Sequence, residues 1–204
     1  MNLPNVRIVL GNGNIGATDV STDGVAALLL TGSAVEGKFV LNKRYVLSLP
    51  SDLTRLGITK ENNPLIYKEV MAFFTEAGDG AELHLLAVSE ATTLTSMVSN
   101  ADGSPIRNLL DTAAGRIRLV GINRNPPASY EATMRNGLDG DVLTAIDGAQ
   151  TIAENYLSKI APIVVLVPGL LWSGSTDNLY KPREGSQNMV SVVLASDGQR
   201  GTVH

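Results

Sequence analysis

The chain has 204 residues, of which 44 % are hydrophobic and 18 % charged, and its net charge is −4. That composition supplies the core of one large domain or two small ones. The acidic balance argues against binding duplex DNA through its phosphates, and the absence of cysteine excludes disulfides, thiolate nucleophiles and cysteine-bound zinc.

The N-terminus lacks a basic segment followed by an apolar one, so we expect no signal peptide. The longest apolar runs fall far short of the roughly 20 residues that span a bilayer. The sequence therefore predicts a soluble, cytosolic protein.

Residues 1–20 differ from the rest and predict an extended N-terminal arm ahead of an α/β domain at residues 21–204. Residues 6–10 have the pattern of a short strand, which Gly11-Asn12-Gly13-Asn14-Ile15-Gly16 breaks. No second short strand follows closely enough to form a hairpin. The strand must therefore pair elsewhere, because its backbone groups need partners.

The same glycine segment spells G-x-G-x-x-G directly after a strand, which is the dinucleotide-binding fingerprint. In that motif the third glycine opens a helix, and a carboxylate follows about twenty residues later at a strand end. Here residues 17–24 carry no apolar helical stripe, and Glu36 lies between Gly32 and Gly37. The sequence favours a flexible turn, with a nucleotide-binding α/β enzyme as the alternative.

Apolar periodicity predicts alternating strands and helices from Val25 onward. We expect strands at 25–30, 82–88, 116–121, 163–167 and 189–195, and helices at 64–77, 92–100, 105–114 and 142–160. A short helix follows Ser51-Asp52 and stops at Gly57. This order predicts an α/β fold, with a mixed, mostly buried sheet flanked by helices.

Candidate chemical groups are few. His84 alternates with Leu83 and Leu85, which predicts a structural histidine on the less apolar face of its strand. Asp139-Gly140-Asp141 precedes the long helix and favours a helix cap over a metal site, and Gly78-Asp79-Gly80 favours a tight turn. The sequence thus predicts neither a catalytic constellation nor a metal or cofactor site.

A local excess of positive charge lies at Arg116, Arg118 and Arg124, with no acidic residue between Asp111 and Glu131. It favours an exposed strand face followed by a loop. The alternative is a basic patch that meets an acidic partner.

Three segments resemble the phage-tail sheath proteins in order along the chain. Gly24-Val25-Ala26-Ala27-Leu28-Leu29-Leu30-Thr31-Gly32 is similar to the family's opening run. Val46-Leu47-Ser48-Leu49-Pro50-Ser51-Asp52-Leu53 resembles its strand and short helix. Tyr67 to Phe74, followed by Glu76-Ala77-Gly78-Asp79-Gly80-Ala81-Glu82-Leu83, resembles its helix, glycine turn and strand. Residues 147–166 and 188–193 continue the same order.

The resemblance implies a structural subunit of a contractile tail, stacked in rings around an inner tube and joined to its neighbours by exchanged terminal strands. It implies two partners, other copies of the chain and a tail tube protein, and no enzyme activity. The place implied is the host cytoplasm during assembly, and then a virion tail or injection-system particle.

In this interpretation Val6, Ile8 and Leu10 of the arm are the candidate subunit interface. Sheath subunits of this type continue past a position like Ala195, so the resemblance implies an N-terminal portion of such a subunit.

Overall fold

The computed structural model describes residues 25–172, 179–181 and 184–194. The predicted arm lies outside these ranges, together with Val6, Ile8, Leu10 and the glycine segment at residues 11–16. The boundary between the arm and the domain therefore stays a prediction.

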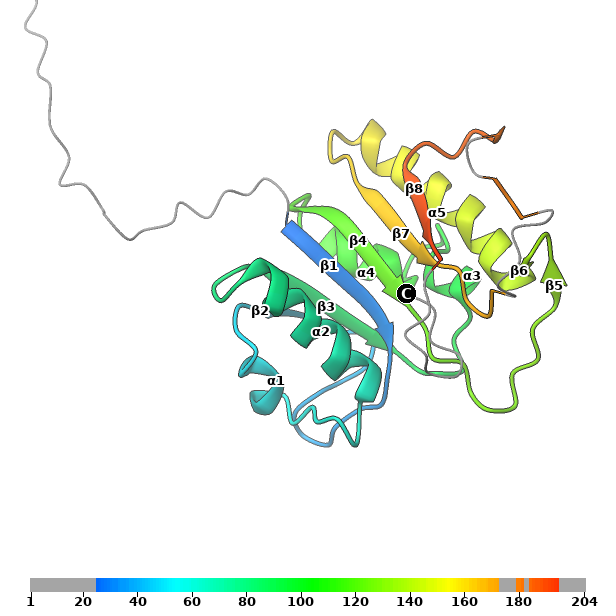
Figure 1. The fold of residues 1–204 in the computed structure, drawn as a ribbon. Coiled ribbons are helices and arrows are strands. Elements are labelled where there is room, and N and C mark those ends of the chain that lie inside the picture. Colours follow the sequence, from blue (N-terminus) through cyan, green and yellow to red (C-terminus); the bar gives the residue numbers. More distant parts are fainter. Residues whose placement is uncertain (1–24, 173–178, 182–183, 195–204) are drawn as a thin grey trace, which may run out of the picture.

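Strands and helices alternate along the described residues (Figure 1). The strands are β1 (Val25–Thr31), β2 (Arg44–Leu47), β3 (Leu83–Val88), β4 (Ile117–Asn123), β5 (Met134–Arg135), β6 (Leu138–Asp139), β7 (Val164–Pro168) and β8 (Val190–Val193). The helices are α1 (Asp52–Arg55), α2 (Pro64–Ala77), α3 (Leu94–Met97), α4 (Pro105–Thr112) and α5 (Gly140–Ser158).

In the described part of the chain, six strands form one sheet in the order β2-β3-β1-β4-β7-β8. All neighbouring pairs are parallel except β2 and β3, which are antiparallel. The predicted mixed sheet flanked by helices is confirmed, and β5 and β6 form a separate small hairpin. β1 lies in the middle of the sheet, which explains its continuous apolar run.

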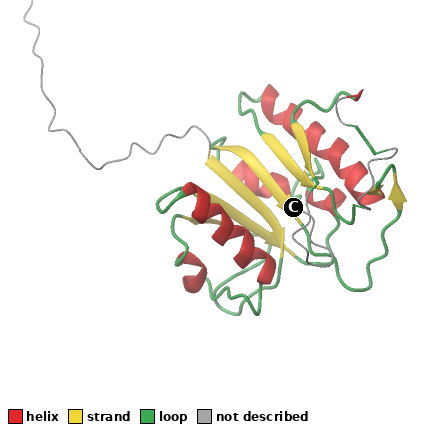
Figure 2. Ribbon diagram, viewed as in Figure 1, coloured by secondary structure: helices red, strands yellow, loops and turns green. Residues whose placement is uncertain are grey.

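Helices cover the two faces of the sheet unequally (Figure 2). α1 and α2 lie on one face at the β2 and β3 side, while α3, α4 and α5 lie on the other. α2 begins at Pro64 and ends before Gly78, whose φ of 80° only glycine adopts freely. Its side chains Ile66, Val70 and Phe74 pack on the strands of that half.

α5 carries the longest apolar stripe and packs against β7 and β8. Its buried positions recur every three or four residues, as predicted for a core-facing helix: Val142, Ala145, Ile146, Ala149, Gln150, Ile152, Ala153 and Tyr156. Gly148 allows α3 to approach closely, since a Cβ at this position would lie 2.9 Å from Val98 Cγ2.

Several local expectations need correction. The helix predicted at 92–100 is the single turn Leu94–Met97. Ser104 and Ser51 occupy N-cap positions without a side-chain cap bond. Instead, the Asp52 carboxylate accepts the backbone N–H groups of Ser48 (2.8 Å) and Leu49 (3.1 Å), because the chain must turn sharply between β2 and α1.

The packing of α5 predicts a strong contrast between two substitutions. Ile152→Asp places an unpaired charge in the core and should abolish soluble folding, because Ile152 is fully buried. Lys159→Ala, at an exposed residue over the Tyr156 ring, should lower the free energy of unfolding by about 0.5 kcal/mol. Soluble yield and thermal melting measure both, and equal melting would refute the helical register.

Candidate functional site

Open α/β sheets bind ligands outside the carboxyl ends of their parallel strands. In this protein polar side chains occupy part of that region, and a mostly apolar pocket of about 200 Å³ remains beside the ends of β1, β4 and β7, with Leu30, Ile122 and Val167 among its lining residues. Asn63 Oδ1 accepts the N–H of Ser33 (2.7 Å), and Asn63 Nδ2 donates to the Ser33 carbonyl (3.1 Å). Gly32 has no room for a side chain, because a Cβ would lie 2.6 Å from Asn63 Oδ1. Thr31 Oγ1 accepts the N–H of Asn125 (2.9 Å) and ties the loop after β4 to β1.

A buried ionic cluster follows β4 in the same region. Arg124 is 1 % exposed, and its Nη1 donates to Asp141 Oδ2 at 3.3 Å. Its guanidinium also stacks on the Tyr130 ring, 4.4 Å from the ring centroid. The Tyr130 hydroxyl donates to Asp139. Arg124 therefore anchors the 124–139 loop inside the protein, and the basic-patch alternative is wrong for this residue.

Asp141 joins α3 to α5. Its carboxylate accepts the backbone N–H groups of Leu94 (2.8 Å) and Thr95 (3.0 Å) at the start of α3, and also the Thr95 hydroxyl (2.7 Å). Asp139 caps α5 by accepting the N–H of Asp141. Helix capping by the Asp139-Gly140-Asp141 segment is confirmed, although Asp141 serves a different helix from the one that it begins.

The electrostatics of this cluster suit a structural role. Burial raises the pKa of Tyr130 to about 12, and the hydrogen bond to Asp139 acts in the same direction. The phenol is therefore protonated at neutral pH and remains a donor. Both carboxylates are occupied by these bonds, which leaves neither of them as a free general base.

A second buried network crosses the sheet at β2, β3 and the start of β4. His84 is fully buried, with Nε2 at 2.6 Å from Glu82 Oε1 and Nδ1 at 3.1 Å from Arg44 Nη1. Glu82 also accepts Arg116 Nη2 at 2.5 Å. The structural role of His84 is confirmed, and both faces of its strand are covered, since every residue of β3 is buried.

The charges in this network favour a neutral imidazole. Burial lowers the pKa of His84, although the hydrogen bond to Glu82 opposes that change. Neutral His84 then donates from Nε2 and accepts at Nδ1, which satisfies both neighbours. Burial would raise the pKa of Glu82, but hydrogen bonds from His84 and Arg116 outweigh it and lower the pKa.

These two networks contain the ionisable groups best placed for catalysis among the described residues, and neither pairs a nucleophile with a free base. Within the same ranges, no group of three or more His, Cys, Asp or Glu side chains could hold a metal ion. None of the described helices is long and apolar enough to cross a membrane.

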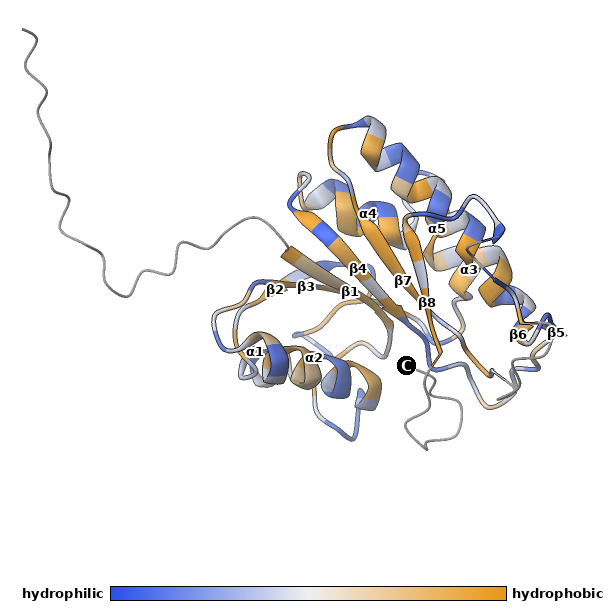
Figure 3. Ribbon diagram, turned by 45° about the horizontal axis from the view of Figure 1, so that its top comes forward, coloured by the Kyte–Doolittle hydropathy of each residue, from blue (hydrophilic) through white to orange (hydrophobic). Residues whose placement is uncertain are grey.

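Among the described residues, apolar side chains are exposed on the sheet itself, and we call this region the bare strip. It lies on the α1 and α2 face of β4 and β7, beyond the reach of α2. Leu119 (37 % exposed) and Val164 (42 % exposed) are paired neighbours there, and Gly121 is paired with half-buried Leu166. α2 reaches β4 at the far end, where Asn123 donates to Glu69 (3.1 Å). Figure 3 shows β7 and β8 coloured as hydrophobic.

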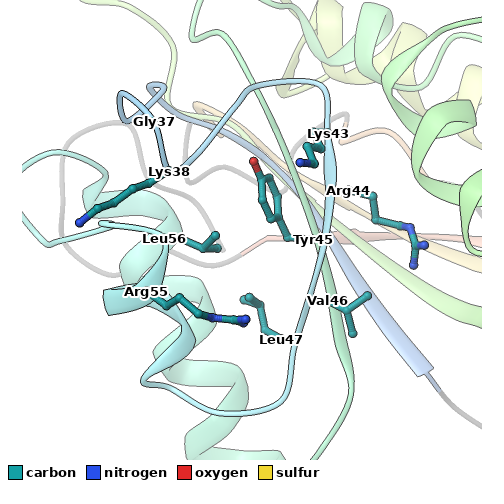
Figure 4. A pocket seen from close by; sticks show the side chains of 9 residues that line it. All are labelled: Gly37, Lys38, Lys43, Arg44, Tyr45, Val46, Leu47, Arg55 and Leu56. Atoms are coloured by element: carbon teal, nitrogen blue, oxygen red, sulfur yellow. The ribbon is translucent and has the colours of Figure 1, made fainter.

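The opposite edge of the sheet is basic. A pocket of about 430 Å³ lies against β2, with Lys38, Lys43, Arg44 and Arg55 among its lining residues and no acidic residue in the lining (Figure 4). Arg55 is paired with Asp52 (2.9 Å), and Arg44 Nε is buried without a hydrogen-bond partner. The sequence did not single out these cations, because the turn, strand and short helix that carry them are brought together only by the fold.

Sequence reasoning also missed Asn63 and the Arg124–Asp141 pair. The signal for Asn63 is its position directly before Pro64, where an N-cap is expected. The pairing of Arg124 with Asp141 leaves no signal in the sequence, because it depends on how the loop after β4 folds back.

Comparison with known proteins gives a family. A family model described as DUF2586, N-terminal domain, matches residues 3–203. No curated protein matches the sequence. Among solved structures, the helical sheath of the anti-feeding prophage in its contracted state, determined by cryo-electron microscopy, is similar at 14 % identity and a TM-score of 0.46. The match covers 94 % of this chain and 45 % of the sheath chain, so this chain spans less than half of that protein.

The His84 network predicts a loss of stability on mild acidification. The unfolded chain protonates His84 near its ordinary pKa of about 6.5, whereas the folded state resists protonation. The free energy of unfolding should therefore fall as the pH drops from 7.5 to 5.5. His84→Gln, whose amide keeps one donor and one acceptor, should flatten this slope, while His204→Gln should leave it unchanged. Equal slopes for all three proteins in urea titrations would contradict the assignment.

The polar groups beside the carboxyl ends of β1 and β4 are already paired, which predicts weak or no nucleotide binding. Calorimetric titration with NAD, NADP, ATP and GTP should give no saturable heat, because Asn63 and Arg124 already use the polar groups in this region. A micromolar dissociation constant for any of the four would revive the alternative of a nucleotide-binding enzyme.

Proposed function

This chain belongs to the DUF2586 family, and we propose that it is a structural subunit of a contractile tail sheath. In this role it polymerises around an inner tube and is joined to its neighbours by exchanged strands. It acts without a cofactor, it assembles in the host cytoplasm, and its partners are other copies of itself and a tail tube protein.

The observation that carries the proposal is the incomplete cover of the sheet. A parallel sheet is normally buried on both faces, yet Leu119 and Val164 are exposed on the bare strip. In a subunit that assembles, neighbouring copies can bury such a strip. In a monomeric enzyme the strip would stay exposed to water. The ordered sheath-like segments in the sequence support the same role.

The arm supplies the exchanged strand in this proposal. Val6, Ile8 and Leu10 alternate along residues 6–10, so one face of the strand is apolar. Pairing with a sheet of a neighbouring subunit gives its backbone N–H and C=O groups their partners and buries these three side chains. Alternate side chains then set the register of the pairing.

Deletion of residues 1–13 tests the arm in the full-length, assembly-competent protein. The deletion should leave the domain folded and abolish polymerisation into tubes. Ile8→Pro should do nearly the same, because it removes a backbone donor and fits a ladder poorly. Asn14→Pro, outside the strand, is the matched control and should assemble. Ordered sheaths from the deletion variant in electron micrographs would show that the subunits are joined in another way.

A further inference from the structure

Both outer strands of the sheet have open edges within the described part of the chain. On β8, the carbonyls of Met189 and Val193 accept N–H groups of Val165 (3.0 Å) and Gly169 (2.9 Å). Because successive residues of a strand direct their backbone groups to opposite sides, Val190 and the residue two positions later face the open side.

The same reasoning applies to β2. The Ser48 carbonyl accepts the N–H of Gly80 (2.8 Å), so it is directed toward the sheet. Tyr45 therefore directs its N–H and C=O groups outward, whereas Leu47, which has the same orientation, is fully buried. The two outer strands, β2 and β8, contain four residues each. Such edges readily pair with strands of another chain.

The strand directions favour contact between unlike edges. β8 runs parallel to β1, whereas β2 runs antiparallel to it. If a second copy continues the sheet in the same orientation, β8 of one copy meets β2 of the next as an antiparallel pair. Antiparallel pairing is slightly more stable per residue than parallel pairing.

The charges at these two edges are opposite. Beside β8, Asp147 accepts Gln187 Nε2 (2.9 Å) and Glu154 accepts Gln150 Nε2 (2.8 Å), which places both exposed carboxylates on the α5 side of this edge. Beside β2, Arg44 is in register with Leu86, a residue that shares a core cluster with α5. Arg44 therefore lies on the same face of the sheet as the carboxylates.

The other face is complementary as well. Phe39 and Leu56 pack in the α2-side cluster next to β2, and Val40 beside them is 55 % exposed. The bare strip belongs to this face too, because Leu119 is in register with Ala26, which packs on that cluster. Figure 4 shows Lys38 and Leu56 on one side of β2, with Arg44 and Val46 pointing to the other.

We propose that copies of this chain associate through their sheet edges, with β8 of one copy pairing with β2 of the next. The α1 side of each copy then covers the bare strip of its neighbour. This contact rests on the proposed self-assembly and adds to it an interface that the arm does not make. It joins two different surfaces, so it repeats from copy to copy and generates a ring or an open helical polymer.

Two substitutions disable one edge each. Val46→Glu, at a side chain 43 % exposed on β2, places a negative charge opposite Asp147 and Glu154 of the neighbour. Val192→Pro removes a backbone donor from the open side of β8. Each variant alone should need at least tenfold higher concentration to associate, measured by sedimentation velocity of the full chain at low salt. An equimolar mixture should associate at a lower concentration than either variant alone, because one intact β8 then meets one intact β2.

Circular dichroism and thermal melting establish that both variants fold, and Ser191→Ala is the matched control on β8. A charge reversal tests the same contact on the α5 face: Glu154→Lys should restore association to the Val46→Glu variant, because Val46 is in register with His84 and lies on the same face as Arg44. Variants that assemble like the wild type would overturn the edge contact and leave the arm as the link. A wild-type chain that stays monomeric at every concentration would overturn the edge contact together with the proposed function.

Discussion

The need of a parallel sheet for apolar cover on both faces governs this structure. α3, α4 and α5 meet that need on one face, where α5 alone buries a stripe that runs along most of its length. On the other face α2 covers β1 and β3, and the cover stops before β7. Leu119 and Val164 are consequently left at the surface. The bare strip is thus a direct result of how few helices the described part of the chain places on that side.

Buried polar networks fix the loops that the helices leave free. Removing one partner of a buried ion pair typically costs about 3–5 kcal/mol, because the other charge stays behind without compensation. The contact between Arg124 and Asp141 therefore holds the 124–139 loop, α3 and α5 in one arrangement. The same network occupies the region where related architectures place a cofactor. Polar groups that could bind a ligand in this region are used instead to hold the loop and the helices in place.

The order of strands and helices could be read from the sequence, because the apolar period of segments such as 64–77 and 142–160 is long and regular. The features that could not be predicted from the sequence depend on tertiary contacts. His84 alternates with leucines and was predicted to be structural, but its partner Arg44 comes from the neighbouring strand β2 and could not be predicted. Arg124 belongs to a run of arginines, and its burial depends on Tyr130 and Asp141. The charged groups beside the two outer strands come from separate parts of the chain, so no local pattern reveals them.

The central position of β1 has a consequence for folding during synthesis. β1 leaves the ribosome first among the described strands, but its two neighbours, β3 and β4, follow only after residues 83 and 117. At about 5–20 residues per second, the nascent chain waits on the order of 5–20 s before both sides of β1 can be paired. During that interval an apolar strand is available to the wrong partners. Slow formation of long-range parallel pairs lengthens the exposure, so chaperone dependence follows from the order in which the strands are made.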